Sequence, residues 1–448
     1  MSKKLAIIAI VCLYFSCQKT PEIKTKYNIL NEQERAILKD EILEDRFINL
    51  LPQLMDDADI DMWLLISREY NEDPILKTML PATWLNARRR TIIVFFRDKS
   101  KNTLERMAVA RYNIGKSIQS VWDKEKEPNQ WKALAEIIKE RNPEKIGINM
   151  SKYFALADGL VKTDYDELFE NLPTAYQNKL VSAEKLGIGW IETRTAMELA
   201  LFRKLVKITH DIIDEAFSTK VIKPGKTTTE DVVWFMRQKV TDLGLETWFH
   251  PTIDLQRNKE VLKSHIASFS KGKEEQIIRK GDLLHCDFGI TYIGLNTDCQ
   301  QHAYVLKEGE NEVPDFLKDA FKKGNRVQDI LTGKMKSGKT GNQILLESLA
   351  QARKEGLKPS IYTHPLGKYG HSAGTTIGMW DSQDGVPFKG DYPLQKNTAY
   401  AIELNTTVTL KEWNKDIRIM LEEAGFFGDD VFEYVNERQT AIKSVKIK

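Results

Sequence analysis

The spacing of hydrophobic positions in the first half of the chain alternates between helical and strand-like. Residues 34–57 carry apolar side chains at helical intervals, and further helical patterns cover 131–139 and 155–172. Short apolar runs typical of strands lie between them, at 62–66, 91–96, 107–112 and 145–148. This mixture predicts a sheet covered by helices, and therefore a mixed α/β domain over residues 34–190.

The pattern changes near residues 185–195, where long amphipathic helices begin. Helical spacing covers 196–217 and 230–243, and Thr227 with Glu230 fits the capping box that starts the second of these helices. Further strands and helices are predicted at 247–250, 283–288, 301–306, 312–332, 342–356, 400–409 and 417–422. A second, larger domain with both helices and strands is therefore predicted over residues 191–448.

The first residues resemble neither domain. Lys3 and Lys4 precede an apolar run of 11 residues at 5–15, which is too short to cross a bilayer and is typical of a secretory signal. Cys17 directly follows the small Ser16, in a sequence that resembles a bacterial lipobox. We expect residues 1–17 to be a signal with lipid attached to Cys17, and 18–33 to be a tether. An ordinary cleaved signal and an uncleaved anchor are the alternatives.

The location that we expect for the protein follows from this leader rather than from composition or charge. We expect an exported protein of the cell envelope or periplasm, which touches the membrane only through its lipid anchor. The chain has 448 residues, 42% of them hydrophobic and 29% charged, which suits two packed domains. Its formal net charge of +2 gives no reason to expect nucleic acid as a partner. Only Cys286 and Cys299 remain beyond the leader, so the fold cannot be a disulfide scaffold.

Two aspartates in the segment 281–305 are candidates for metal binding. Asp287 ends an apolar run, and Asp298 lies 11 residues later, beyond glycines that suit a hairpin turn. If the two face each other across the hairpin, their carboxylates repel unless a cation lies between them. The same register would place Cys286 opposite Cys299 on the other face, within reach of a disulfide, with two reduced thiols as the alternative. Aspartate in a hairpin is otherwise a common turn residue.

Three later segments add the other side chains that divalent metals prefer. His371 lies among glycines in 363–381, Glu403 interrupts an apolar run in 398–405, and Glu422 follows another apolar run. Each alone also fits an ordinary loop or strand end. Together with the two aspartates they supply carboxylates and an imidazole, the usual ligands of hard and borderline divalent ions.

The order of these motifs resembles the pita-bread metallopeptidase superfamily of methionine aminopeptidase, Xaa-Pro aminopeptidase, prolidase and creatinase, over most of residues 190–440. The region before it is similar to the creatinase/prolidase N-terminal domain. The resemblance implies an α+β fold, with a pita-bread C-terminal domain and a smaller mixed α/β N-terminal domain. It also implies two divalent metal ions, with manganese expected before zinc or cobalt. Their implied ligands are Asp287, Asp298, His371, Glu403 and Glu422.

The resemblance also assigns roles within the site. Asp298 and Glu422 would bridge the two ions, and Glu403 would lie near the attacking water. His250 matches a substrate-side histidine. The family's second active-site histidine, seven residues after the ligand, corresponds to Gly378 here, and His364, seven residues before His371, is a candidate to replace that ring. The usual Glu-Pro-Gly at the first glutamate is Glu-Leu-Asn. These departures weaken the expectation of a full exopeptidase rate and of a preference for Xaa-Pro.

The function predicted from this resemblance is hydrolysis of N-terminal peptide bonds in short peptides, as in an Xaa-Pro aminopeptidase. A prolidase-like dipeptidase, a metal-free creatinase-like C–N hydrolase and a catalytically weak peptide-binding lipoprotein are the alternatives. The sequence does not fix the oligomeric state, and a homodimer is one of the assemblies it allows. Residues 333–340 match the phosphate-binding P-loop pattern, but a P-loop follows a strand, and 316–332 has helical spacing. We therefore predict an exposed turn between helices there.

Overall fold

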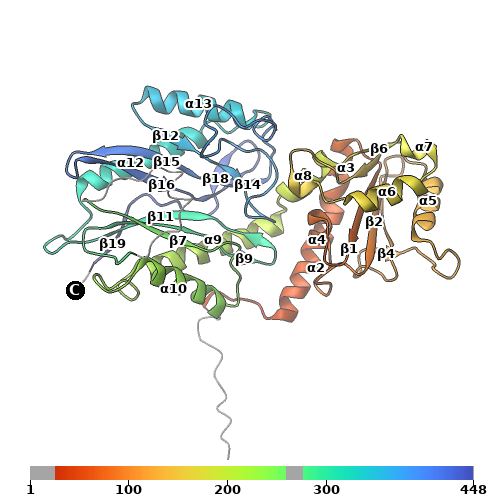
Figure 1. The fold of residues 1–448 in the computed structure, drawn as a ribbon, viewed down its shortest axis with the longest axis horizontal. Helices are drawn as coiled ribbons and strands as arrows, with labels where there is room; N and C mark the ends of the chain where they lie inside the picture. The colour runs from red at the N-terminus through yellow and green to blue at the C-terminus, as the bar shows by residue number, and fades with distance from the viewer. Residues whose placement is uncertain (1–25, 259–275, 447–448) are drawn as a thin grey trace, which may run out of the picture.

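The computed structural model describes residues 26–258 and 276–446. The predicted signal, its lipid-attachment site at Cys17 and the first half of the predicted tether, 18–25, lie outside the described residues. The described chain forms two domains side by side, each with its own sheets and helices (Figure 1). Within those ranges, none of the helices has the length and apolar character that crossing a membrane requires.

The N-terminal domain is built on one six-stranded mixed sheet, with strand order β4-β3-β2-β1-β5-β6. Hydrophobic side chains from both faces of the sheet pack beneath helices, so its central strands are buried on both sides. The strands are β1 Met62–Arg68, β2 Arg90–Asp98, β3 Thr103–Val109, β4 Gln119–Ser120, β5 Ile146–Ile148 and β6 Leu180–Ser182.

The helices of this domain differ in two places from the sequence prediction. The pattern at 34–57 forms two helices, because Pro52 lacks an amide hydrogen and clashes with the preceding turn, so the first helix ends before it. The pattern at 155–172 forms a short 3-10 turn and then a separate helix. The helices are α2 Glu32–Asn49, α3 Leu51–Ala58, α4 Pro74–Thr78, α5 Gln130–Arg141, η1 Ala155–Ala157, α6 Lys162–Asn171, α7 Thr174–Gln177 and α8 Glu184–Glu192.

The C-terminal domain contains several small sheets, with strand orders β19-β11-β8-β7, β12-β15-β16, β13-β14-β17-β18 and β10-β9. The strands before residue 310 are β7 Thr252–Gln256, β8 Leu283–Phe288, β9 Thr291–Tyr292, β10 Leu295–Asn296 and β11 Cys299–Val305. The later strands are β12 Pro359–Ile361, β13 His364–Pro365, β14 Thr398–Ala401, β15 Leu404–Leu410, β16 Lys415–Leu421, β17 Ala424–Phe427, β18 Phe432–Tyr434 and β19 Lys443–Val445.

Two pairs of helices enclose these sheets (Figure 1). Helices α9 Ala196–Ala216 and α10 Thr229–Asp242 pack against β7, β8 and β11. Helices α12 Asp315–Thr332 and α13 Gly341–Lys354 pack against β12, β15 and β16. The capping box of α10 joins Thr228 to Asp231, one residue later than predicted.

The P-loop pattern at 333–340 lies between two helices, as predicted. Helix α12 ends at Thr332, so no strand precedes the pattern, and the Thr340 hydroxyl accepts from the Gln343 amide to cap α13. The Lys339 ammonium lies 2.7 Å from a carboxylate oxygen of Glu347 on α13. The segment is therefore a turn between helices and lacks the strand that a phosphate-binding loop requires.

The register of the β8–β11 hairpin differs by two residues from the predicted one. Asp287 lies opposite Gln300, Cys286 lies opposite Gln301, and Cys299 lies opposite Phe288. The prediction that Cys286 faces Cys299 is therefore wrong, and both cysteines are buried and free. The reason is the turn, which is centred one residue later than assumed, at Ile293 and Gly294 with φ of 50° and 73°.

A shift of two residues leaves every side chain on its predicted face, because the side-chain period of a strand is two. Asp287 and Asp298 are thus diagonal neighbours on one face, and Cys286 and Cys299 lie on the other.

A buried ion cluster joins the two domains. The Glu198 carboxylate at the start of α9 lies 2.6 Å from the Arg46 guanidinium of α2 and 2.9 Å from the Lys368 ammonium. The Arg46 guanidinium also stacks 4.3 Å from the ring centre of Trp190 on α8. Nearby, the Tyr369 hydroxyl donates a hydrogen bond to the Pro74 carbonyl oxygen over 2.7 Å. These contacts tie the segment that contains Lys368 and Tyr369 to the N-terminal domain.

Candidate metal centre

Four carboxylates from separate strands converge in the C-terminal domain. Asp287 lies near the end of β8, Asp298 just before β11, Glu403 just before β15 and Glu422 just after β16. Oxygen atoms of Asp287, Asp298 and Glu422 lie within 4.8 Å of one another, and Glu403 forms a second such group with Glu422 and His364. A pair of backbone hydrogen bonds between Gln300 and Glu422 joins the strands that carry them.

The electrostatics of this group favour a bound cation. Asp298 is 4% exposed and Glu422 is 1% exposed. Burial, followed by repulsion from the neighbouring carboxylates, raises the pKa of Asp298, Glu403 and Glu422 well above the usual value. Among the described residues, Asp298 Oδ1 and Glu422 Oε1 have no hydrogen-bond partner. Buried carboxylates without partners are unfavourable unless a cation or proton compensates them, and oxygen-rich groups of this kind fit divalent ions.

His364 points its free ring nitrogen at these carboxylates. The ring is 3% exposed and lies on β13, which pairs with β14. Its Nδ1 lies 3.0 Å from the Pro365 carbonyl oxygen, to which it donates, so Nε2 carries the lone pair. That Nε2 lies 3.7 Å from Glu422 Oε1 and 4.0 Å from Asp298 Oδ2, and it has no hydrogen-bond partner among the described residues. Burial lowers the pKa of His364 to about 4, which keeps the ring neutral.

His371 lies beside His364, on the outer side of the group. The two ring centres are 4.8 Å apart, and a ring nitrogen of His371 lies within 4.8 Å of ligand atoms of Asp298 and His364. His371 is more exposed than His364, and its ring packs against Trp248 at 5.4 Å and Tyr362 at 6.1 Å. The structure thus places both histidines at the carboxylates, with His364 more deeply buried.

Gly378, at the position seven residues after His371, lies in a backbone conformation that excludes a side chain. Its φ is 71°, and a Cβ atom there would lie 2.3 Å from the Ile361 carbonyl oxygen. No ring at this position could reach the carboxylates without moving the backbone of β12. The seven-residue spacing between two site histidines is instead present in the pair His364 and His371.

His250 makes its contacts with helix α10. It is exposed, its ring centre is 5.5 Å from that of Trp234, and its Nδ1 is 3.4 Å from the Arg237 guanidinium, both on α10. The predicted strand at 247–250 is irregular, and β7 begins at Thr252 instead. From this segment it is Trp248 that packs against His371, and its indole nitrogen donates to the Thr297 carbonyl oxygen over 2.8 Å.

Sequence reasoning missed three side chains at the site: Trp248, Tyr362 and Gln300. Gln300 could have been found, because a residue two positions after Asp298 on the same strand faces the same side. Trp248 and Tyr362 carry no such local signal, since they reach the histidines only through the fold.

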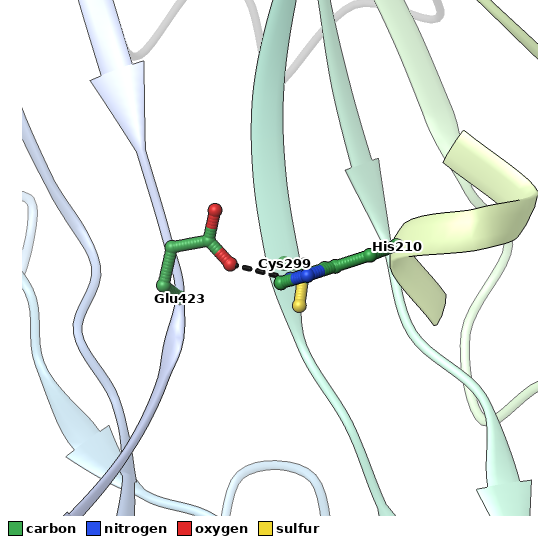
Figure 2. Close-up of side chains that lie close together, drawn as sticks. All are labelled: His210, Cys299 and Glu423. Carbon is green, nitrogen blue, oxygen red and sulfur yellow. Dashed lines mark hydrogen bonds and ion pairs between the residues drawn. The ribbon is translucent and has the colours of Figure 1, made fainter. Parts of the chain in front are cut away.

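A different polar cluster occupies the opposite face of the sheet (Figure 2). His210, Cys299 and Glu423 lie together there, with His210 Nε2 at 2.7 Å from Glu423 Oε2. The other oxygen of Glu423 accepts from Gln301 Nε2 and from the Gln439 amide, and His210 Nδ1 lies 3.0 Å from Asn436 Nδ2. The ring nitrogens and carboxylate oxygens therefore all have partners, so this cluster is a hydrogen-bonded network that needs no cation.

Comparisons with known proteins indicate the family and the fold of the chain. A family model described as Metallopeptidase family M24 matches residues 200–426. No curated protein matches the chain. Among solved structures, the X-Pro aminopeptidase from Thermotoga maritima MSB8 is 15% identical, with 88% of this chain and 100% of that chain covered and a TM-score of 0.61. The Xaa-Pro dipeptidase from Bacillus anthracis is 16% identical, with 93% and 100% covered and a TM-score of 0.56.

A third similar structure is the N-terminal domain of the FACT complex subunit SPT16 from chickpea (Cicer arietinum). It is 12% identical, with 93% of this chain and 99% of that chain covered and a TM-score of 0.52. At these identities the structural similarity shows the fold alone. The predicted α+β fold, with a pita-bread C-terminal domain and a smaller mixed α/β N-terminal domain, is confirmed.

Proposed function

Because the chain belongs to metallopeptidase family M24, we propose that it is a dinuclear-metal enzyme that releases N-terminal residues from short peptides, like an Xaa-Pro aminopeptidase. The observation that carries this proposal is the convergence of four carboxylates and two histidines on one face of the sheet. Three of these side chains have a buried atom with no hydrogen-bond partner among the described residues, as the ligands of a shared cation would: Asp298 Oδ1, Glu422 Oε1 and His364 Nε2.

Two divalent ions would be held by Asp287, Asp298, His364, Glu403 and Glu422, with manganese expected before zinc or cobalt. Asp298 and Glu422 belong to more than one of the ligand groups, which suits them to bridge the ions. His364 takes the ligand role that the resemblance implied for His371, because its free nitrogen faces two of the carboxylates. His371 then takes the substrate-side role.

The chemistry follows from these positions. When bound, two divalent ions would lower the pKa of a shared water and polarise the scissile carbonyl. The Glu403 carboxylate, oriented by its hydrogen bond from Gln300, would take up the proton that the shared water loses and pass it to the leaving amine. His371 stands beside Trp248 and Tyr362, where its ring can hydrogen-bond the substrate and the aromatic side chains can pack against it.

A prolidase-like dipeptidase is the second candidate, because the Xaa-Pro dipeptidase from Bacillus anthracis shares the fold at similar coverage. A metal-free creatinase-like hydrolase fits less well, since this chain retains all the candidate metal carboxylates. Export to the envelope and lipid attachment at Cys17 remain part of the proposal. A peptide-binding role without turnover is the remaining alternative.

The test is to purify the chain from residue 18 onward, count its metals and assay peptides. We expect about two divalent ions per chain and release of the first residue from peptides longer than two residues. Peptides with and without proline at the second position measure the preference for Xaa-Pro. Cleavage of dipeptides alone would favour the prolidase-like candidate. Full activity after chelation and dialysis to a metal-free state would exclude the dinuclear-metal proposal.

Glu422 and Glu423 provide a matched pair of variants. The two are neighbours, but Glu422 belongs to the carboxylate group and Glu423 to the network with His210 on the opposite face. We expect Glu422→Gln to lose metal and activity, because the shared water loses its two-metal activation. Glu423→Gln should keep both metals. Equal metal loss in the two variants would show that the effect comes from general damage to the sheet.

A further inference from the structure

Gln300 lies among the carboxylates of the candidate metal centre, but it is not a candidate ligand. It lies directly opposite Asp287 in the β8–β11 hairpin and is 5% exposed. Its backbone amide donates to the Glu422 carbonyl oxygen over 2.8 Å, and the Glu422 amide donates back over 3.2 Å. The residue therefore joins β11 to the chain just after β16.

The side-chain amide of Gln300 bonds to two of the metal carboxylates. Its Nε2 donates to Glu403 Oε1 over 2.9 Å and to Glu422 Oε2 over 2.8 Å. Its Oε1 accepts from His285 Nε2 over 2.9 Å. The opposite amide orientation would place the carbonyl oxygen against two carboxylates, so the contacts determine which way the amide points.

His285 fixes that orientation from the other side. It lies on β8 and pairs across the sheet with Asp254 of β7, whose carboxylate oxygen is 3.6 Å from His285 Nδ1. The ring is buried and packs 5.1 Å from the ring of His302. The amide of Gln300 is thus held between a rigid ring and the two glutamates.

We infer that Gln300 is a positioning residue that sets metal affinity by holding Glu403 and Glu422 in the geometry of ligands. This inference rests on the proposed metal centre. Each glutamate has one oxygen bound to Gln300, which leaves Glu422 Oε1 directed at His364. A hydrogen-bonded partner behind the ligands lowers the entropy lost when the metal binds, and such partners orient the ligands they hold.

The neutrality of glutamine is essential to this role. A lysine or arginine at the same place would also donate to the carboxylates, but its charge would compensate them and compete with the metal. An amide orients the oxygens and leaves their negative charge for the cation. The chemistry of the residue thus fits a partner of metal ligands better than a structural ion pair.

The test compares Gln300→Met with Gln301→Met, both of which remove an amide and nearly conserve side-chain volume. Gln301 is also buried and also donates to a glutamate, but on the opposite face, where its Nε2 lies 2.8 Å from Glu423 Oε1. The dissociation constant for Mn²⁺ is measured by competition with a coloured chelator. We expect it to rise about 10–100-fold in Gln300→Met and to stay close to wild type in Gln301→Met.

A second measurement separates positioning from a structural role. Mn²⁺ should raise the melting temperature of the wild type and of Gln301→Met more than that of Gln300→Met, and excess Mn²⁺ should restore peptidase activity to Gln300→Met. Gln300→Asn keeps the amide but shortens the side chain by one methylene, so it should show the same loss of affinity. It is the variant to measure if Gln300→Met does not fold.

The outcomes distinguish this inference from the proposed function. Equal Mn²⁺ affinity in wild type and in the folded Gln300 variants would overturn the inference alone, as would an equal loss in Gln301→Met. A wild-type protein that binds no divalent metal would overturn the proposed function, and this inference with it.

Discussion

At the scale of single residues, two histidines seven positions apart differ in what surrounds them. His364 is held on a strand and its Nδ1 donates to a carbonyl oxygen, so its other nitrogen faces Glu422 and Asp298. His371 follows in a loop and packs against the aromatic rings of Trp248 and Tyr362. The first environment suits a metal ligand and the second suits contact with substrate.

Alanine variants of the two histidines should therefore fail in different ways. His364→Ala should lose metal, because it removes a neutral ligand from the buried group. His371→Ala should keep its metals and lose turnover by about 10²–10⁴-fold, the range for a positioned proton donor or acceptor. Metal content by mass spectrometry and kcat for a peptide substrate measure the two effects. Metal loss only in His371→Ala would return the ligand role to that residue.

At the scale of elements, the turn of the metal-bearing hairpin requires a left-handed backbone. Gly294 has φ of 73°, and a Cβ atom placed there would meet no atom within 4 Å. Gly294→Ala should therefore lower the free energy of unfolding by about 1–2 kcal/mol, entirely through backbone strain. Denaturant unfolding measures the change, and Mn²⁺ affinity should be unaffected because the β8–β11 pairing still fixes the register. An alanine variant as stable as wild type would contradict this account of the turn.

The short helix α4 begins at a buried aspartate that should make stability depend on pH. Asp73 Oδ1 accepts from the Ile75 and Leu76 amides, and Oδ2 accepts from Asn149 Nδ2. Burial outweighs these hydrogen bonds and raises the pKa of Asp73 to about 6 from the ordinary 3.8. The folded protein therefore holds this proton more tightly than the unfolded chain does.

The sign of the pH effect follows from that difference. The contribution of Asp73 to stability is fully present below about pH 4 and is lost as the pH rises through about 6. A pKa difference of this size corresponds to about 3 kcal/mol. Between about pH 4 and pH 7, the free energy of unfolding should fall more steeply for wild type than for Asp73→Asn, which has no proton to lose. Parallel curves for the two proteins in denaturant unfolding would contradict the raised pKa.

At the scale of the whole molecule, Glu198 connects the domains by compensating buried cations. Burial alone would raise its pKa, but Arg46, Lys368 and Arg194 lower the pKa below its ordinary value. The same carboxylate contacts Lys368, which lies in the segment between the two site histidines. The ion cluster thus connects the position of the histidine segment to the N-terminal domain.

Removing that carboxylate should destabilise the whole protein. Glu198→Gln removes the carboxylate that faces Arg46, Arg194 and Lys368. Breaking a buried ion pair in this way costs about 3–5 kcal/mol. Denaturant unfolding measures the loss. Glu355→Gln, which breaks an exposed pair with Arg326, is the control and should have a much smaller effect. Similar effects of the two variants would show that the ion cluster around Glu198 does not stabilise the protein as a buried ion pair does.

Apart from the strand predicted at 247–250, which is irregular, the sequence by itself determined the strands of the site and the faces of their side chains. The bounds predicted for β8, 283–288, match the structure, because a short apolar run between turn residues has few other ways to be buried. Asp287 and Asp298 share a face although the predicted register was two residues out, since alternation along a strand is local and survives a shift of two. Glu403 and Glu422 could be singled out for the same local reason.

Only the tertiary structure decided which side chains meet. The pairing of β13 with β14 brings His364 to the carboxylates, while the packing of Gly378 on the Ile361 carbonyl leaves no room for a ring there. Gln300 reaches Glu422 across 122 positions of sequence. Local periodicity fixes which way a side chain points, but its neighbours depend on long-range strand pairing and helix packing, which no single segment encodes.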